Sequence, residues 1–354
     1  MVPALKYIVF FTEKKEELEF STGLVIKENG ENILAQCLLY LQVKDASKFI
    51  SGRSKIMEKL KYGLLGLNYD TEAGRGWPGA RYAPDSIRKA MSGIMNRMED
   101  GFLFDVNNNR LVDYNKIDFK DFGNCDNIVH YEHYQGLKDM AEEIKKVMAE
   151  GYKPILLGGD HSVTNAGFMA LHDVADGRIG IIDFDAHLDI KVDSPVQGRF
   201  SGSSEIRRAT EMEKYDAHNI VEIGPRGYNY PEHYHFIRDS GLTIFTARDV
   251  YKLGAEEIAK RTIEKVRKNT DYVYMTVDID ALDMAYALGS GGQEPAGLNH
   301  FQLSDLIKAF APYVDVVDFV EVNPMTDHRE LTSHVCANLI LDYIAAAYYE
   351  KFEK

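Results

Sequence analysis

From about residue 61 onward, short apolar runs rich in β-branched residues alternate with longer amphipathic stretches. The apolar runs have the length of buried strands and read YKPILLGG, RIGIIDFD, HNIVEIGPRG, LTIFTARDV, YVYMTVDID and VDVVDFVEVNP. Between them, GLKDMAEEIKKVMAEG and GAEEIAKRTIEKVRKN carry apolar residues at three- and four-residue steps, which is typical of helices with one buried face. This alternation predicts a three-layer α/β/α fold, in which helices cover both faces of a central parallel sheet.

Residues 1–60 have a different pattern. The stretch KYIVFFTEKKEELEFSTGLVIKENGENILAQCLLYLQV suggests a few strands joined by polar turns, with KENGEN as the tip of a hairpin. No linker rich in Gly, Pro or Ser separates this stretch from the rest of the chain. We therefore expect a small, β-rich N-terminal extension over residues 1–60, packed on a main domain over residues 61–354 or at a subunit contact.

Charge and cysteine usage exclude several classes of protein. The formal net charge of −14 argues against a general binder of nucleic acid or anionic membranes, which needs a basic surface. The three cysteines lie far apart in the sequence and form no paired framework, as expected for an intracellular, reduced protein. The N-terminus has no convincing signal peptide, and no apolar run approaches membrane-spanning length. We expect a cytoplasmic protein.

Acidic and histidine side chains gather where three of the predicted strands end. Asp160 and His161 come after one strand, DFDAHLDI at 183–190 ends another, and VDIDALD at 277–283 ends a third. The carboxyl ends of parallel strands share one edge of a sheet, and residues two apart on a strand point to the same face. The pattern therefore places two histidines and at least four carboxylates at one locus.

Such a set of carboxylates needs a counter-charge. A single aspartate at a strand end commonly caps the next helix or bonds to loop backbone, so each one alone has an ordinary structural explanation. Several carboxylates converging without a comparable set of Arg or Lys would repel one another. Carboxylates with two imidazoles suit Mn²⁺ or a similar divalent ion, whereas structural zinc sites usually bring thiolates. The sequence thus predicts a two-metal centre, a device that activates water at neutral pH.

The motifs GGDHSVT, DFDAHLD and TVDIDALD, in this order, resemble those of the ureohydrolases, the family of arginase, agmatinase and formimidoylglutamase. The resemblance covers about residues 61–350, from YGLLGLNYDTEAGRGWPGARYAPDSIRKA to VVDFVEVNPMTDHRELTSHVCANLI. It implies an arginase-like fold, a catalytic domain over residues 61–354, and a homo-oligomer of three or six chains.

The resemblance also implies the roles of individual residues. It implies two Mn²⁺ ions, bridged by a hydroxide that attacks an amidine or guanidine carbon. The implied metal ligands are His161, Asp185, His187, Asp189, Asp278 and Asp280. Asp189 matches the carboxylate that also orients the hydroxide and handles its proton. Glu321 matches the glutamate that receives the cationic nitrogens of the substrate.

Side chains beyond the ligands bear on the substrate. Arginases and agmatinases carry a His-Gly pair after the central motif, whereas this chain has Ser201 and Gly202, similar to the Ser-Gly-Thr stretch of formimidoylglutamases. Lys191 stands where formimidoylglutamases have Arg, and a cation there fits an anionic substrate tail. Arg226 is a further candidate for binding carboxylate, as is Arg199. A loop of small residues and a solvated lysine are the plain alternatives.

These features favour a manganese-dependent formimidoylglutamase, an enzyme of histidine degradation that releases formamide and L-glutamate. The alternatives are an agmatinase or guanidino-acid hydrolase that releases urea, and a catalytically silent relative that keeps its metals. The related single-zinc deacetylase fold would use fewer carboxylates. Two family prolines are replaced by Met284 and Leu288, which is expected to loosen a loop that walls the pocket.

Overall fold

The computed structural model describes residues 27–28, 31–32, 59–71, 77–125, 132–194 and 196–353. The chain divides into two units, residues 1–58 and 59–354. In the first unit, β1 (Lys27–Glu28) and β2 (Glu31–Asn32) pair antiparallel, as the predicted hairpin requires. The other residues of this unit lie outside the described residues, so its β-rich character and its role stay predictions.

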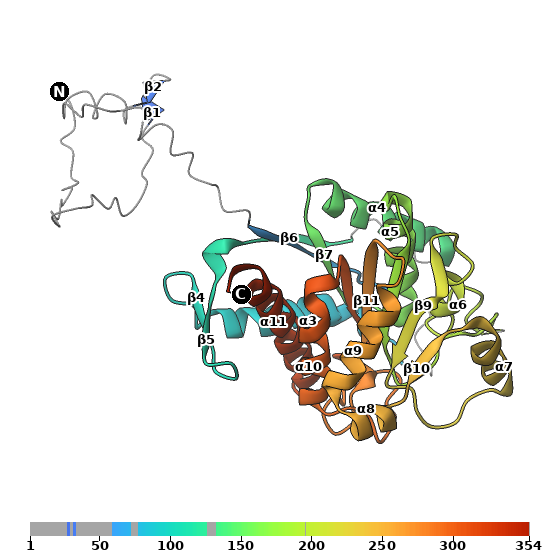
Figure 1. Ribbon diagram of the computed structural model, residues 1–354. Helices are drawn as coiled ribbons and strands as arrows, with labels where there is room; N and C mark the ends of the chain where they lie inside the picture. The colour runs from blue at the N-terminus through green and yellow to red at the C-terminus, as the bar shows by residue number, and fades with distance from the viewer. Residues whose placement is uncertain are drawn as a thin grey trace, which may run out of the picture. The chain divides into compact units, whose positions relative to one another are not determined.

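The second unit is built on a parallel sheet of eight strands (Figure 1). Every pair of neighbouring strands in it runs parallel, which confirms the predicted sheet. In spatial order the strands are β10 (Thr243–Phe245), β9 (Tyr215–Ile223), β8 (Ile179–Phe184), β11 (Tyr272–Asp278), β12 (Val316–Val320), β7 (Lys153–Leu157), β3 (Leu60–Gly66) and β6 (Ile117–Asn124).

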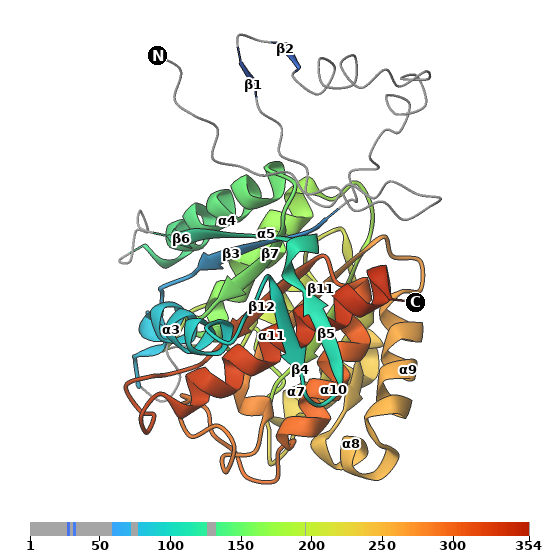
Figure 2. The ribbon, with the colours of Figure 1, turned by 90° about the vertical axis from the view of Figure 1, so that its left-hand side faces the viewer.

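Helices cover both faces of this sheet, which gives the three-layer α/β/α architecture (Figure 2). One apolar core packs against α3 (Ala83–Met95), α8 (Ala247–Leu253), α9 (Ala255–Val266), α10 (His300–Phe310) and α11 (Leu331–Phe352). The core on the other face packs against α4 (His133–Ala149), α5 (Thr164–Val174), α6 (Glu205–Ala209) and α7 (Pro231–Ser240).

The local sequence explains why these elements form. All six residues of β8 are buried, as expected for a strand covered on both faces. In α9 the buried residues Ile258, Ala259, Thr262 and Val266 recur at the helical period on one face. Reciprocal side-chain bonds between Asn299 and Gln302 satisfy backbone N–H groups at the start of α10.

A separate antiparallel pair, β4 (Phe102–Asp105) and β5 (Arg110–Asp113), lies outside the main sheet. The sequence patterns did not predict it. Among the described residues, no helix combines the length and the apolar character needed to cross a bilayer.

The strand order creates a topological switch point in the sheet. Strands β7 and β8 are consecutive along the chain, yet β11 and β12 lie between them. The carboxyl ends of β8, β11, β12 and β7 are therefore neighbours at one edge, where parallel sheets bind ligands. After β7 the chain turns through Gly158 (φ +63°) and Gly159 (φ +99°), where a Cβ on Gly159 would lie 2.6 Å from the Leu67 carbonyl oxygen. Only glycine fits this turn, which delivers the next residues to the edge.

Candidate active site

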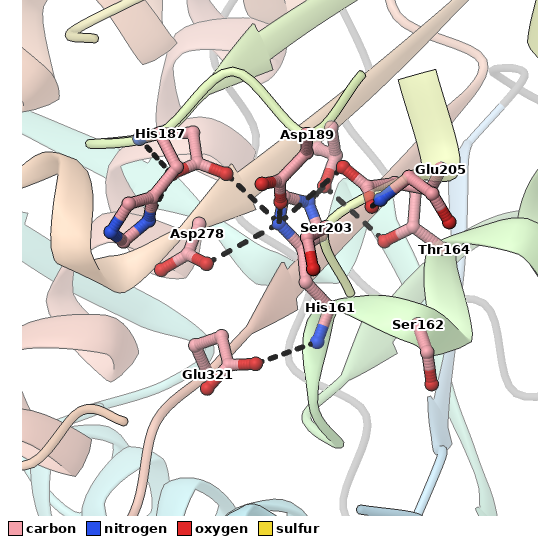
Figure 3. Close-up of polar contacts among 12 residues, drawn as sticks. His161, Ser162, Thr164, His187, Asp189, Ser203, Glu205, Asp278 and Glu321 are labelled. Carbon is pink, nitrogen blue, oxygen red and sulfur yellow. Dashed lines mark hydrogen bonds and ion pairs between the residues drawn. The ribbon is translucent and has the colours of Figure 1, made fainter. Parts of the chain in front are cut away.

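The six side chains predicted as metal ligands meet at this edge of the sheet. Figure 3 labels four of them, His161, His187, Asp189 and Asp278. His161 comes after β7 and begins a short 3-10 turn. Asp185, His187 and Asp189 come after β8, and Asp278 and Asp280 lie at the end of β11. Three segments that are far apart in the sequence thus contribute to one cluster.

The first donor group surrounds the Nδ1 atom of His161. This atom lies 3.1 Å from Asp185 Oδ2, 3.2 Å from Asp189 Oδ2 and 3.3 Å from Asp278 Oδ2. The Oε1 atom of Glu205 is 3.8 Å away. All of these side chains are buried. Four carboxylates therefore lie close to this nitrogen, and the ligand atoms of His161, Asp185, Asp189 and Glu205 all lie within 4.8 Å of one another.

The second donor group surrounds the Nδ1 atom of His187. This atom lies 3.1 Å from Asp185 Oδ1 and 3.3 Å from Asp280 Oδ2. Asp185 belongs to both groups, since its two oxygens face the two histidines separately. The arrangement offers two neighbouring positions to cations, joined by one shared carboxylate.

The chemistry of these atoms fits a site for cations. Within the described part of the chain, His161 Nδ1, Asp185 Oδ2 and Glu205 Oε1 are buried and have no hydrogen-bond partner. Burial, together with the charge of neighbouring carboxylates, raises the pKa of both Asp278 and Glu205. Burial lowers the pKa of His161, but the nearby carboxylates outweigh this effect and raise it. Bound divalent cations would neutralise the charge of these clustered carboxylates.

Polar residues behind the cluster fix the orientation of His161. Its Nε2 atom lies 3.0 Å from Thr276 Oγ1, on strand β11. With the proton on Nε2 donated to Thr276, the Nδ1 lone pair is free to face the carboxylates. Asp318 accepts bonds from Thr164 and Tyr274 at 2.8 Å and 2.6 Å beside this threonine. The imidazole is thus held from the core side.

Glu321 stands beside this cluster, directly after β12. Its Oε1 accepts a bond from the backbone N–H of His161 at 2.9 Å. Burial and the nearby Asp160 raise the pKa of Glu321 to about 8. No lysine or arginine of the described residues forms an ion pair with Glu321, and an amidinium group would supply the missing cation.

Two of the acids have unusual backbone conformations. Asp189 has φ +44° and Glu321 has φ +60°, a left-handed region that non-glycine residues seldom adopt. Such strain concentrates at functional sites, where the surrounding structure holds it in place. Burial and the charge of Asp185 raise the pKa of Asp189 to about 6.

Solvent reaches the two histidines unequally. The side chain of His187 is 34% exposed, whereas that of His161 is 1% exposed. The cluster is therefore closed at the His161 end and open at the His187 end, and a small molecule would approach from the open end.

The Ser201–Gly202 pair lies against the closed end. A Cβ on Gly202 would lie 3.2 Å from the Ser162 nitrogen and 3.3 Å from the His161 Cβ, so this position has little room for a side chain. The buried Ser201 hydroxyl lies 3.2 Å from Ser204 Oγ. In this structure Ser201 shapes its own turn, and its part in substrate binding stays a prediction.

Two of the three cations predicted to bind a carboxylate, Arg226 and Arg199, bond to other groups of the protein. All three guanidinium nitrogens of Arg226 donate to backbone carbonyls, among them Asp280 O at 2.8 Å and Glu294 O at 2.8 Å. These donors hold together the loop after β11, and the part of Arg226 in binding a substrate carboxylate stays a prediction. Arg199 pairs with Glu211. Lys191 Nζ lies over the Tyr230 ring, 5.1 Å from its centre.

Asp283 stabilises the loop in which Met284 and Leu288 stand in place of the two family prolines. The carboxylate of Asp283 accepts from the backbone N–H of Ala285 at 2.9 Å and of Gly297 at 3.1 Å. Met284 and Leu288 are 40% and 49% exposed. Whether their presence loosens the loop stays a prediction.

Sequence reasoning missed Glu205 and Thr276. Glu205 begins α6 and sits in a stretch of small residues with no strand periodicity to mark it. Thr276 had a usable signal, because it lies two residues before Asp278 on a buried strand and so shares its face.

Comparison with known proteins agrees with this geometry. A profile described as the arginase family matches residues 60–345. The formimidoylglutamase of Halalkalibacterium halodurans is 29% identical over 80% of this chain and 86% of that protein. The mitochondrial agmatinase of Gallus gallus is 29% identical over 81% of each chain. The solved structure of proclavaminate amidino hydrolase from Streptomyces clavuligerus superposes with a TM-score of 0.71 and 26% identity, over 83% of this chain and 93% of that one.

Proposed function

Because this chain belongs to the arginase family and is a metal-dependent amidinohydrolase, we propose that it hydrolyses N-formimidoyl-L-glutamate at a centre of two divalent cations. One water is consumed, the C–N bond to the glutamate nitrogen breaks, and the products are L-glutamate and formamide. The observation that carries this proposal is the pair of donor groups that share Asp185.

The residues present fit the proposed cations. His161, Asp185, Asp189 and Asp278 would hold one of them, and Asp185, His187 and Asp280 would hold the other. Manganese suits this mixture of carboxylate and imidazole. When bound, the pair would supply Lewis-acid activation of water for attack on the amidine carbon.

Two acids of this chain would handle protons and charge during the reaction. Asp189 is placed to orient the attacking water and to take its proton, and then to pass that proton to the departing nitrogen. Glu321 would bind the amidinium of the substrate by a paired, charge-assisted contact and hold its carbon toward the cluster. The open end at His187 would admit the substrate, while the closed end at His161 would keep bulk water out.

Two features support an amidine with an acidic tail. Ser201 and Gly202 replace the His-Gly pair of arginases and agmatinases, as in the formimidoylglutamase pattern. Lys191 lies two residues after the DFDAHLD motif and supplies a positive charge on the same loop. The similarity to a formimidoylglutamase at 29% identity points the same way.

A guanidino substrate with urea as product is the second candidate. Arg226 donates to backbone carbonyls and Arg199 pairs with Glu211. Among the described residues, Lys191 is therefore the predicted carboxylate-binding cation whose charged group has neither a hydrogen bond nor an ion pair. One cation recognises a substrate with two carboxylates less completely than two would. The agmatinase relative matches as much of the chain, at the same identity.

A substrate panel separates these candidates. The purified chain with Mn²⁺ is offered N-formimidoyl-L-glutamate, agmatine, arginine and guanidinobutyrate, and formamide, glutamate and urea are measured. We expect formamide and glutamate from the first compound alone. Urea from a guanidino compound, with no turnover of the first, would establish the second candidate. Bound metal without turnover of any compound would identify a catalytically silent relative.

The same proposal includes manganese as the resident ion, assembly into trimers or hexamers, and a cytoplasmic location. Manganese and the assembly rest on the resemblance to the ureohydrolases, and the location rests on the composition of the chain. Metal analysis of the protein purified without added ions and its mass in solution test the first two.

A further inference from the structure

Glu205 is a fully buried carboxylate that belongs to none of the three ligand motifs. It lies at the start of α6, shortly after the Ser201–Gly202 pair. Its Oε2 accepts a bond from the Ser204 backbone N–H at 3.2 Å. Its Oε1 is buried and has no hydrogen-bond partner among the described residues. This oxygen is the one that faces the cluster, 3.8 Å from His161 Nδ1.

Within the described ranges, no lysine or arginine supplies a counter-charge to Glu205. Of the ion pairs formed by the described residues, none joins Glu205 to a lysine or an arginine, and its only ionic neighbour is His161. A buried carboxylate with an unpaired oxygen is costly unless a cation neutralises it. The position of Oε1 therefore points to a ligand in the cluster.

Glu205 also lies where a cation would sit. Its ligand atom falls within 4.8 Å of those of His161, Asp185 and Asp189, so the four form one group. In Figure 3, Glu205 lies beside Asp189, on the far side of the cluster from His187. The carboxylate is thus placed at the closed end only.

We propose that Glu205 is an additional metal ligand, which serves the cation at the His161 position and makes that position richer in carboxylates than the one at His187. This inference rests on the proposed two-cation centre. It adds a seventh side chain to the six that the family resemblance supplies. Asp185, Asp189, Asp278 and Glu205 face His161, whereas Asp185 and Asp280 face His187.

Because their ligand sets differ, the two positions would prefer different metal ions. Oxygen-rich, anionic ligand sets suit hard ions such as Mn²⁺ and Mg²⁺, whereas a higher share of imidazole suits Zn²⁺. Glu205 would therefore bind manganese more firmly at the buried position and discriminate there against zinc. Exchange of the metal would occur first at the exposed His187 position.

Metal binding by the full chain tests the proposal without relying on turnover. Glu205→Gln keeps the size of the side chain and removes its charge. The matched control is Glu222→Gln, since Glu222 is equally buried and lies on β9 outside both donor groups. Neither of its oxygens has a hydrogen-bond partner in the part of the chain that the structure describes. Free Mn²⁺ is monitored during titration of the apo protein, and Zn²⁺ competition is measured on the loaded protein.

We expect the wild type to bind two Mn²⁺ ions. Glu205→Gln should weaken one of the two affinities by about tenfold or more and lower its preference for Mn²⁺ over Zn²⁺. Glu222→Gln should leave both affinities within about threefold of the wild type. Equal Mn²⁺ affinities in Glu205→Gln and wild type would overturn the proposal. A wild type that binds no metal would instead overturn the proposed function, and this inference with it.

Thermal unfolding distinguishes a ligand from a structural residue. With chelator present, Glu205→Gln should melt at or above the wild-type temperature, because an unpaired buried charge is gone. Added Mn²⁺ should raise the melting temperature of Glu205→Gln by less than it raises that of the wild type. An equal loss of melting temperature in both conditions would assign Glu205 a structural role and overturn the proposal. Glu205→Asp, which keeps the charge on a shorter side chain, should restore part of the Mn²⁺ affinity.

Discussion

Asp185 presents a different oxygen of the same carboxylate to each of two histidines. Its Oδ2 lies 3.1 Å from His161 Nδ1 and its Oδ1 lies 3.1 Å from His187 Nδ1. Burial raises its pKa, but the contacts with the two imidazoles outweigh burial and lower it well below the ordinary value. Asp185 therefore stays ionised while Asp189, Asp278 and Glu205 are driven toward protonation, and it fixes the spacing of the two positions.

Glu321→Gln tests the residue assigned to the substrate cation. The amide keeps the shape of the side chain and the bond from the His161 N–H, but it cannot pair with an amidinium. Loss of a desolvated charge pair costs about 2–5 kcal/mol, so kcat/KM should fall by about 30-fold or more. Bound metal should stay at the wild-type level in elemental analysis.

The control for this change is Glu330→Gln. Glu330 also has a left-handed backbone, with φ +58°, but its carboxylate pairs with Lys89 on the surface. Steady-state kinetics of the control should match the wild type. A Glu321→Gln variant with unchanged kcat/KM would remove Glu321 from the binding of substrate.

Strand ends were the most predictable elements of the site. The motifs DFDAHLD and TVDIDALD predict that acids and histidines gather after β8 and at the end of β11, as the structure shows. The two-residue strand period does not extend through them, because β8 ends at Phe184 and Asp280 lies in a 3-10 turn. The contacts of Arg226 were not predictable, since only tertiary structure brings the Asp280 and Glu294 carbonyls to its guanidinium. Glu205 was missed for a similar reason, because its loop reaches His161 through the fold and no spacing in the sequence indicates it.

Thr276→Val tests whether β11 orients the buried imidazole. The substitution nearly preserves volume but leaves the Nε2–H of His161 without its acceptor at 3.0 Å. Loss of a hydrogen bond that orients a metal ligand typically lowers metal affinity by about 10–100-fold. We expect this loss at one of the two positions, measured by Mn²⁺ titration.

Thr262→Val provides the matched control on another element. Thr262 is buried in α9 and its hydroxyl has no hydrogen-bond partner among the described residues. Its replacement should leave both Mn²⁺ affinities unchanged. If the two threonine variants bound Mn²⁺ alike, the orienting role of Thr276 would be ruled out.

At the scale of the whole molecule, the cluster couples stability to pH when metal is removed. Burial raises the pKa of Asp189 to about 6 and that of Glu321 to about 8. The folded chain then holds protons that the unfolded chain releases above about pH 4. These two groups therefore stabilise the fold fully below about pH 4. Their contribution is lost as the pH rises toward 8.

The melting temperature in chelator should accordingly fall between about pH 5 and pH 8. The slope is about 1.4 kcal/mol per pH unit for each group that stays protonated only in the fold. Saturating Mn²⁺ should flatten or reverse the trend, because cations favour the ionised carboxylates. If the melting temperature in chelator instead rose from pH 5 to pH 8, Asp189 and Glu321 would not be buried acids without a counter-charge.

The overall architecture was predictable because the repeated strand and helix patterns agree along most of residues 61–354. The alternation predicted the parallel sheet and its two helical layers, as observed. The order of strands was not predictable from it, since consecutive strands β7 and β8 are separated in space by β11 and β12. This order places the carboxyl ends of β7, β8, β11 and β12 side by side, and the residues of the site lie at these ends.

Anomalous diffraction from crystals of the Mn²⁺-loaded protein would show whether two cations bind at this edge of the sheet. We expect two manganese peaks per chain, one among His161, Asp185 and Asp189 and the other among Asp185, His187 and Asp280, with Asp185 contacting both. A single peak, or manganese bound away from the ends of β7, β8 and β11, would contradict this expectation.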